Sequence, residues 1–152
     1  MEQTELTVTI CGKDGYIHKN SVSLNTPREV SHAYYGLSGN LNNMTCQTQC
    51  VQRYFGIEEP LEMLHLVVDY GTLVKDDETA SAYSVSCAEY FGQTYQIYCC
   101  TYQDIPSLRY YTHILLNPIG YLDGKVFDVN GENMALFCDY LFHLSGIPVK
   151  VI

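Results

Sequence analysis

The chain has 152 residues, 47% of them hydrophobic, and its 17 acidic and 8 basic residues give a formal net charge of −9 at pH 7. This length and apolar content predict a single folded domain over residues 1–152 and argue against a disordered chain. Because affinity for DNA comes largely from neutralised phosphates, the acidic balance argues against direct DNA binding. It is compatible with a basic protein partner, and simple solubility is the alternative explanation.

The cellular compartment is indicated by what the sequence lacks. The acidic N-terminus has no apolar core typical of a secretory signal, and no run of about 18 apolar residues predicts a membrane span. We therefore expect a cytoplasmic protein whose seven Cys are reduced. Cys46 and Cys50 stand four residues apart in an expected helix and could hold a metal, but no second Cys or His pair accompanies them at zinc-finger spacing. We expect no metal and no cofactor.

The first helix signal follows an expected strand over 6–11. Thr26 is a typical capping residue, Pro27 suits the first helical position, and Glu29 stands three residues after the cap. This pattern predicts a helix that runs through Tyr35 and breaks at the glycines that follow.

The rest of the chain alternates strand and helix patterns. Further strands are expected over 62–70, 95–101, 110–117 and 149–152. Further helices are expected over 43–55, 76–91 and 130–144. Asp76, Asp77 and Glu78 favour the start of the second of these, and Gly146 favours the end of the last. The consecutive strands over 95–101 and 110–117 can pair as antiparallel neighbours. The expected fold class is therefore α+β, with an antiparallel sheet of about five strands and four helices packed on it.

The most specific pattern consists of single His, Asp and Asn residues at or after expected strands. They are His65, Asp104, His113 and Asn117, followed by the turn Asp123-Gly124-Lys125-Val126-Phe127. In order and spacing they resemble the N-terminal domain of the relaxase/mobilisation nucleases of plasmids and conjugative elements. These are His-hydrophobic-His endonucleases that nick one DNA strand through a tyrosine. The resemblance covers about 26–144 and implies a relaxase-like fold.

The chain departs from that family at the metal ligands. The family pattern reads His-x-Asp and then three His at alternate positions. Here Tyr102 replaces the first His, and Arg109 and Tyr111 occupy two of the alternate positions before His113. Alternate strand residues share a face, so this face would carry a guanidinium, a phenol and one imidazole. Because Arg is permanently charged and repels a cation, we expect neither a metal nor a catalytic residue here.

Our first hypothesis is a non-catalytic relaxase-like protein of a mobile genetic element that acts by protein binding. Its most concrete form is an anti-CRISPR inhibitor whose acidic surface engages the basic nucleic-acid channel of a CRISPR effector nuclease. The residues expected to bind the partner are Glu58, Glu59 and Glu62 in one turn and Asp76, Asp77 and Glu78 in another. Ordinary solvated charge is the alternative for both groups.

Two further hypotheses stay open. In the second, the chain still nicks DNA. Tyr34 and Tyr35 are the candidate nucleophiles, Tyr35 is the positional match to the family's tyrosine, and His113, His65 and Asp104 lie around a metal. In the third, it is a mobilisation accessory subunit that binds a genuine relaxase through its tyrosine-rich surface, since 14 residues are Tyr. The structural alternatives are packing for the tyrosines, satisfied strand histidines, and a loop-holding role for Asp104 and Asn117.

Overall fold

The computed structural model describes residues 5–11, 27–38 and 41–152. Within them the strands are β1 (Leu6–Cys11), β2 (Arg28–Tyr35), β3 (Leu64–Asp69), β4 (Ile97–Gln103), β5 (Tyr110–Leu116) and β6 (Val149–Val151). The helices are the short 3-10 helix η1 (Leu41–Asn43) and the α-helices α2 (Met44–Tyr54), α3 (Asp77–Gly92) and α4 (Glu132–Ser145).

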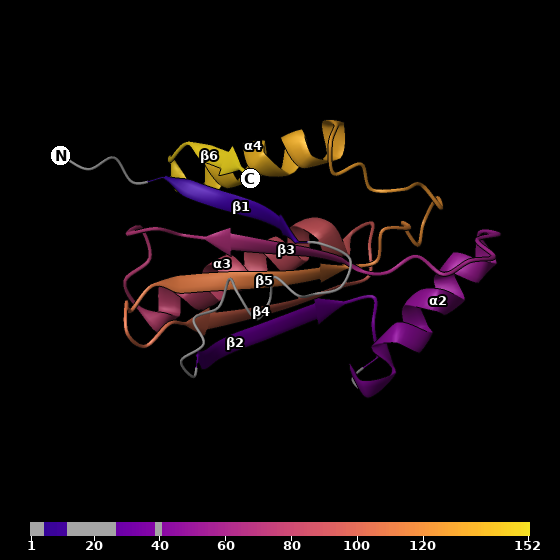
Figure 1. Ribbon diagram of the computed structural model, residues 1–152, viewed down its shortest axis with the longest axis horizontal. Coiled ribbons are helices and arrows are strands. Elements are labelled where there is room, and N and C mark those ends of the chain that lie inside the picture. The colour runs from indigo at the N-terminus through magenta and orange to yellow at the C-terminus, as the bar shows by residue number, and fades with distance from the viewer. Residues whose placement is uncertain (1–4, 12–26, 39–40) are drawn as a thin grey trace.

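All of these strands belong to one sheet, in the order β2-β4-β5-β3-β1-β6 (Figure 1). The expected α+β class is confirmed. The expected antiparallel sheet of five strands with four helices is wrong, because the described residues form a mixed sheet of six strands with three α-helices. The parallel pair is β1 with β6, since the chain crosses over through α4 before it returns beside β1.

The extra strand is β2, where the sequence predicted a helix. Its residues pair with β4 from Arg28 opposite Gln103 to Tyr35 opposite Ile97. Helix α3 presses on this strand so closely that a Cβ on Gly92 would lie 2.6 Å from the Cβ of Tyr35. Pairing with β4 and packing under α3 therefore override the local capping pattern. Its proposed cap, Thr26, lies outside the described residues.

Local signals were correct at two other helices. The side chain of Asp76 accepts a hydrogen bond from the Thr79 backbone N–H at 2.7 Å and begins α3. Helix α4 ends at Gly146, whose φ of 72° is left-handed and suits glycine.

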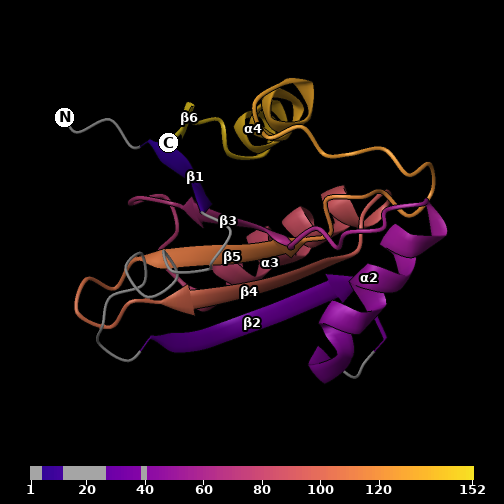
Figure 2. The same ribbon diagram turned by 45° about the vertical axis from the view of Figure 1, so that its right-hand side comes forward.

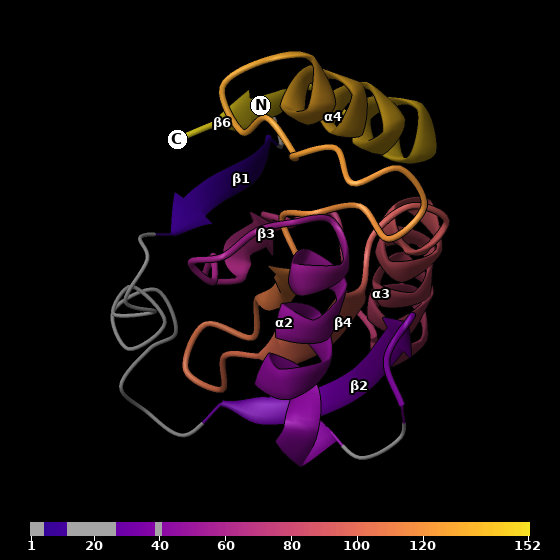
Figure 3. The same ribbon diagram turned by 90° about the vertical axis from the view of Figure 1, so that its right-hand side faces the viewer.

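The core lies between one face of the sheet and the helices α3 and α4, which cover the same side (Figure 3). Phe91 of α3 and Phe137 of α4 are fully buried there with their ring centroids 4.6 Å apart. Helix α2 lies instead at the end of the sheet where β2 ends (Figure 2). We call the opposite face of the sheet the histidine face, because it carries His65 and His113.

Candidate functional site on the histidine face

The histidine face brings together two of the residues on which the resemblance depends. His65 of β3 and His113 of β5 are both buried, and His65 Nε2 lies 2.9 Å from His113 Nδ1. In such a contact one imidazole must donate the hydrogen bond and the other must accept it, so the bond uses one ring nitrogen of each histidine. Those nitrogens are thereby engaged with each other, and a metal would have to break this bond to use them.

Tyr102, which the resemblance sets at the position of a family histidine, lies beside this pair. The ring of Tyr102 meets that of His113 edge to face, with centroids 5.5 Å apart. Burial raises the pKa of the Tyr102 phenol above its ordinary value, and burial together with the Asp69 carboxylate raises that of Tyr111. Both phenols are therefore neutral at physiological pH, whereas strong binding to a metal would require the phenolate form.

Arg109 neutralises a nearby acid. Its Nη2 lies 3.2 Å from both carboxylate oxygens of Asp69, the last residue of β3. The ion pair is partly exposed, with 45% of the Arg109 side chain and 26% of the Asp69 side chain accessible. An acidic side chain that could have joined a metal site is thus bound to a permanent cation.

Asp104 and Asn117 each accept a hydrogen bond from a backbone N–H, that of Ser107 and that of Ile119 respectively, and each also binds other side chains. Asp104 Oδ2 accepts a hydrogen bond from the Ser107 hydroxyl at 2.6 Å inside the turn between β4 and β5. Asn117 is fully buried and joins two other amides, accepting from Gln52 Nε2 at 3.0 Å and donating to Gln96 Oε1 at 2.8 Å. Asn117 thereby fixes α2 against the start of β4.

The two candidate nucleophiles leave β2 on opposite faces. Tyr34 pairs with Tyr98 and lies on the histidine face, whereas Tyr35 pairs with buried Ile97 and packs against Gly92 of α3. The structure therefore does not bring Tyr35 together with His65, His113 and Asp104. Alternation along β2 could have separated these tyrosines, but only if the segment had been recognised as a strand.

No metal-binding cluster lies within the part of the chain that the structure describes, where no three His, Cys, Asp or Glu side chains are placed to hold an ion. Cys46 and Cys50 are both exposed on α2 and have no third ligand from this set.

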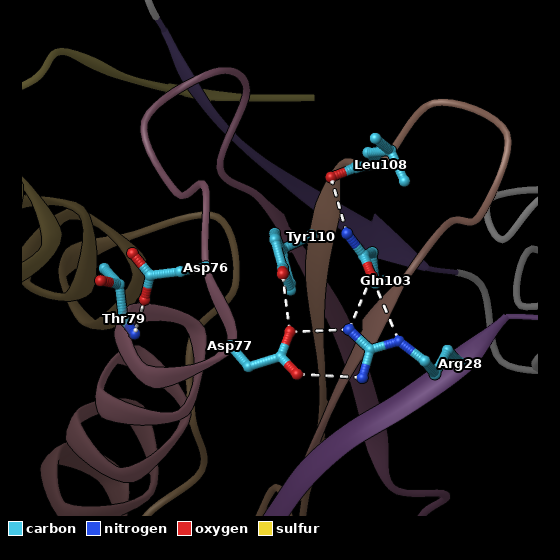
Figure 4. A network of polar contacts seen from close by, with 7 residues as sticks. All are labelled: Arg28, Asp76, Asp77, Thr79, Gln103, Leu108 and Tyr110. Carbon is cyan, nitrogen blue, oxygen red and sulfur yellow. Dashed lines mark hydrogen bonds and ion pairs between the residues drawn. The ribbon is translucent and has the colours of Figure 1, made fainter.

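The two acidic groups differ in what their carboxylates do. Glu58, Glu59 and Glu62 are exposed in the loop between α2 and β3 and make no hydrogen bond or ion pair with the described residues. In the second group, Asp76 caps α3, and Asp77 is bound by two partners (Figure 4).

Those partners of Asp77 are Arg28 and Tyr110. Arg28 Nη2 donates to Asp77 Oδ1 at 2.6 Å, and the Tyr110 hydroxyl donates to the same oxygen at 2.7 Å. These hydrogen bonds lower the pKa of Asp77 to about 2. The two acidic groups lie beyond opposite ends of β3, a strand of six residues that separates them by roughly 20 Å. They therefore do not form one surface.

Comparison with known proteins adds no assignment, because no protein family, curated protein or solved structure matches this chain. Among the helices that the structure describes, none has both the length and the apolar character needed to cross a bilayer.

Proposed function

We propose that this chain is a non-catalytic, relaxase-like protein of a mobile genetic element that acts by binding another protein. In its most specific form it is an anti-CRISPR inhibitor that binds the basic nucleic-acid channel of a CRISPR effector nuclease. The observation that carries the proposal is the hydrogen bond of 2.9 Å between His65 and His113. It engages one ring nitrogen of each histidine, and a metal could use those two nitrogens only by breaking this bond.

The side chains around His65 and His113 also support a non-catalytic protein. A metal that polarises a scissile phosphate needs several nitrogen or oxygen ligands on one side. Tyr102 and Tyr111 are neutral phenols, and Arg109 places a guanidinium at the position of a family ligand. This set of side chains disfavours a divalent cation.

Charge supports a protein partner over DNA. Of the basic residues that the structure describes, Arg28 and Arg109 are already paired with Asp77 and Asp69. The others are Arg53, Lys75, Lys125 and Lys150, which come from separate segments. Dispersed cations give no continuous phosphate-binding track. A surface with excess acid instead complements a basic protein channel.

The test is co-elution of the purified protein with CRISPR effector nucleases, each with and without guide RNA. The proposal expects a stable complex with at least one effector, and weaker binding to the guide-loaded form if the channel is the site. No complex with any effector would contradict the anti-CRISPR form.

The runner-up functions need their own assays. Exposed tyrosines support the accessory-subunit reading, since Tyr34, Tyr35 and Tyr54 have exposed fractions of 37%, 39% and 83%. Co-elution with a relaxase in place of an effector would favour it. Retained nicking would give a covalent adduct with single-stranded DNA in Mg²⁺ or Mn²⁺, and Tyr35→Phe or Tyr34→Phe would identify the nucleophile.

A further inference from the structure

A groove of about 380 Å³ opens at the end of the sheet where β3 begins and β5 ends. It lies between the loop that joins α2 to β3 and the segment that joins β5 to α4, which run near each other in Figures 1 and 2. The lining residues are mostly apolar and are Cys11, Pro60, Leu61, Glu62, Met63, Leu64, Pro118, Val126, Phe127 and Val129.

The groove is open to a partner and apolar at its mouth. Leu61 and Val126 line it and have exposed fractions of 41% and 57%. Leu122, in the same segment as Val126, is 67% exposed, and Tyr54 at the end of α2 is 83% exposed. The exposed side chains of Leu61 and Val126 favour association, because burying them against a partner removes apolar surface from water.

The loop that forms one rim of this groove carries acidic residues. Glu62 lines it, and Glu58 and Glu59 precede it in the same loop. All of these carboxylates are exposed and make no ion pair among the described residues, whereas Asp76 and Asp77 are used in capping and in the Arg28 pair. Their charges are thus available to a cationic partner.

The loop that carries these residues is held in place. The buried side chain of Gln52 donates to the Leu61 carbonyl at 2.9 Å and accepts from the Leu61 backbone N–H at 2.8 Å. The Phe55 ring, just after α2, packs closely on Gly124 of the segment that joins β5 to α4. A pre-formed surface loses less conformational entropy on binding.

We infer that this groove is the docking site for a basic segment of a protein partner, in which Lys or Arg residues flank apolar side chains. The apolar side chains would enter between Leu61 and Val126, and the cations would meet Glu58, Glu59 and Glu62. The inference rests on the proposed function only in taking the partner to be a protein. The charge of the rim selects the occupant, since an acidic or neutral segment gains nothing from it.

The first experiment measures the affinity of an effector found by co-elution for two groove variants. Leu61→Asn/Val126→Thr removes apolar surface, and Glu58→Gln/Glu59→Gln/Glu62→Gln removes the rim charge. Each should raise Kd about tenfold or more. The controls are Leu136→Asn on α4, which is 49% exposed, and Glu89→Gln/Glu132→Gln/Asp139→Asn, which removes the same charge elsewhere. The controls should change Kd less than about twofold. Unchanged affinity of the groove variants, or equal losses in the charge controls, would overturn the inference.

The second experiment does not depend on any effector. A short synthetic peptide of alternating Lys and Leu is titrated into the isotopically labelled full chain, beside peptides with Leu replaced by Ser or Lys replaced by Gln. Amide shifts at Leu61, Met63 and Val126 with the parent peptide alone would support the groove. Shifts elsewhere, equal shifts with the Ser peptide, or no shifts would overturn it. If no effector binds but the peptide does, the proposed function fails and the groove stands.

Discussion

The imidazoles of His65 and His113 meet across neighbouring strands, with His65 Nε2 2.9 Å from His113 Nδ1. Both side chains are buried, so the removal of either ring leaves a polar group without this partner. We expect His65→Leu or His113→Leu alone to lower the free energy of unfolding by about 1–3 kcal/mol.

The double variant His65→Leu/His113→Leu distinguishes the loss of the hydrogen bond between the histidines from a general loss of packing. His65→Leu/His113→Leu should be less destabilised than the sum of the single variants by at least about 0.5 kcal/mol, as measured by urea unfolding. His65→Leu combined with His143→Leu, on α4, serves as the control and should be additive within about 0.5 kcal/mol. Additivity in both pairs would show that the contact contributes nothing.

The resemblance to relaxases predicts that the metal site can be rebuilt. Tyr102→His/Arg109→His/Tyr111→His restores the family's pattern at positions that share the histidine face with His113, and it frees Asp69 from its ion pair. We expect this variant to bind Mn²⁺ in isothermal titration calorimetry, because imidazoles and carboxylates on one side are suitable ligands. The Ala triple variant at the same positions should bind none. Equal behaviour of the two variants would count against the resemblance.

The ion pair between Arg28 and Asp77 predicts a dependence of stability on acid. Asp77 has a pKa of about 2 in the folded protein, below the ordinary aspartate value of 3.8. A lowered pKa stabilises the fold above the unfolded value, and the contribution is lost as pH falls through the folded value. Wild type should therefore exceed Asp77→Asn in unfolding free energy at pH 6, and the difference should shrink below about pH 4 and vanish near pH 2.

The control for this pH profile is Glu78→Gln, the next residue along α3, whose exposed side chain makes no ion pair with the described residues. Its difference from wild type should stay small across the same range. A profile for Asp77→Asn that runs parallel to wild type at every pH would contradict the assignment of the ion pair.

Several elements followed from the sequence because their signals are local. The cap at Asp76 and the glycine after α4 lie within one turn of the helix ends that they define. The capping pattern at Pro27 and Glu29 is just as local, yet β4 and α3 convert that segment into a strand. Strands far along the chain therefore determine whether such a segment becomes a strand or a helix. The parallel pairing of β6 with β1 could not be predicted for the same reason.

The candidate site was foreseeable only in part. Strand alternation correctly places Tyr111 and His113 on one face of β5, whereas Arg109 lies just before that strand. The hydrogen bond between His65 and His113 depends on the register of β3 with β5, which a single sequence does not reveal. The groove was missed because loops far apart in sequence form it together.

Asn117 links the family-like segment to the groove. Its side chain binds Gln52, which in turn holds Leu61 in place. Asn117→Ala should lower the free energy of unfolding by about 3 kcal/mol, because buried amides lose their partners. Asn130→Ala, at an exposed position, should change it by less than about 0.5 kcal/mol. Urea unfolding checks both, and similar values for the two variants would rule out a structural role for Asn117.

The central claim is that the protein acts by binding a nuclease and not by cutting DNA. The most direct measurement is a titration of the purified chain into each CRISPR effector nuclease, with guide RNA added afterwards and target cleavage as the readout. The account predicts that cleavage by at least one effector falls to background near an equimolar ratio, while Glu58→Gln/Glu59→Gln/Glu62→Gln inhibits more weakly. Full cleavage by every effector at a large excess of the protein would contradict it.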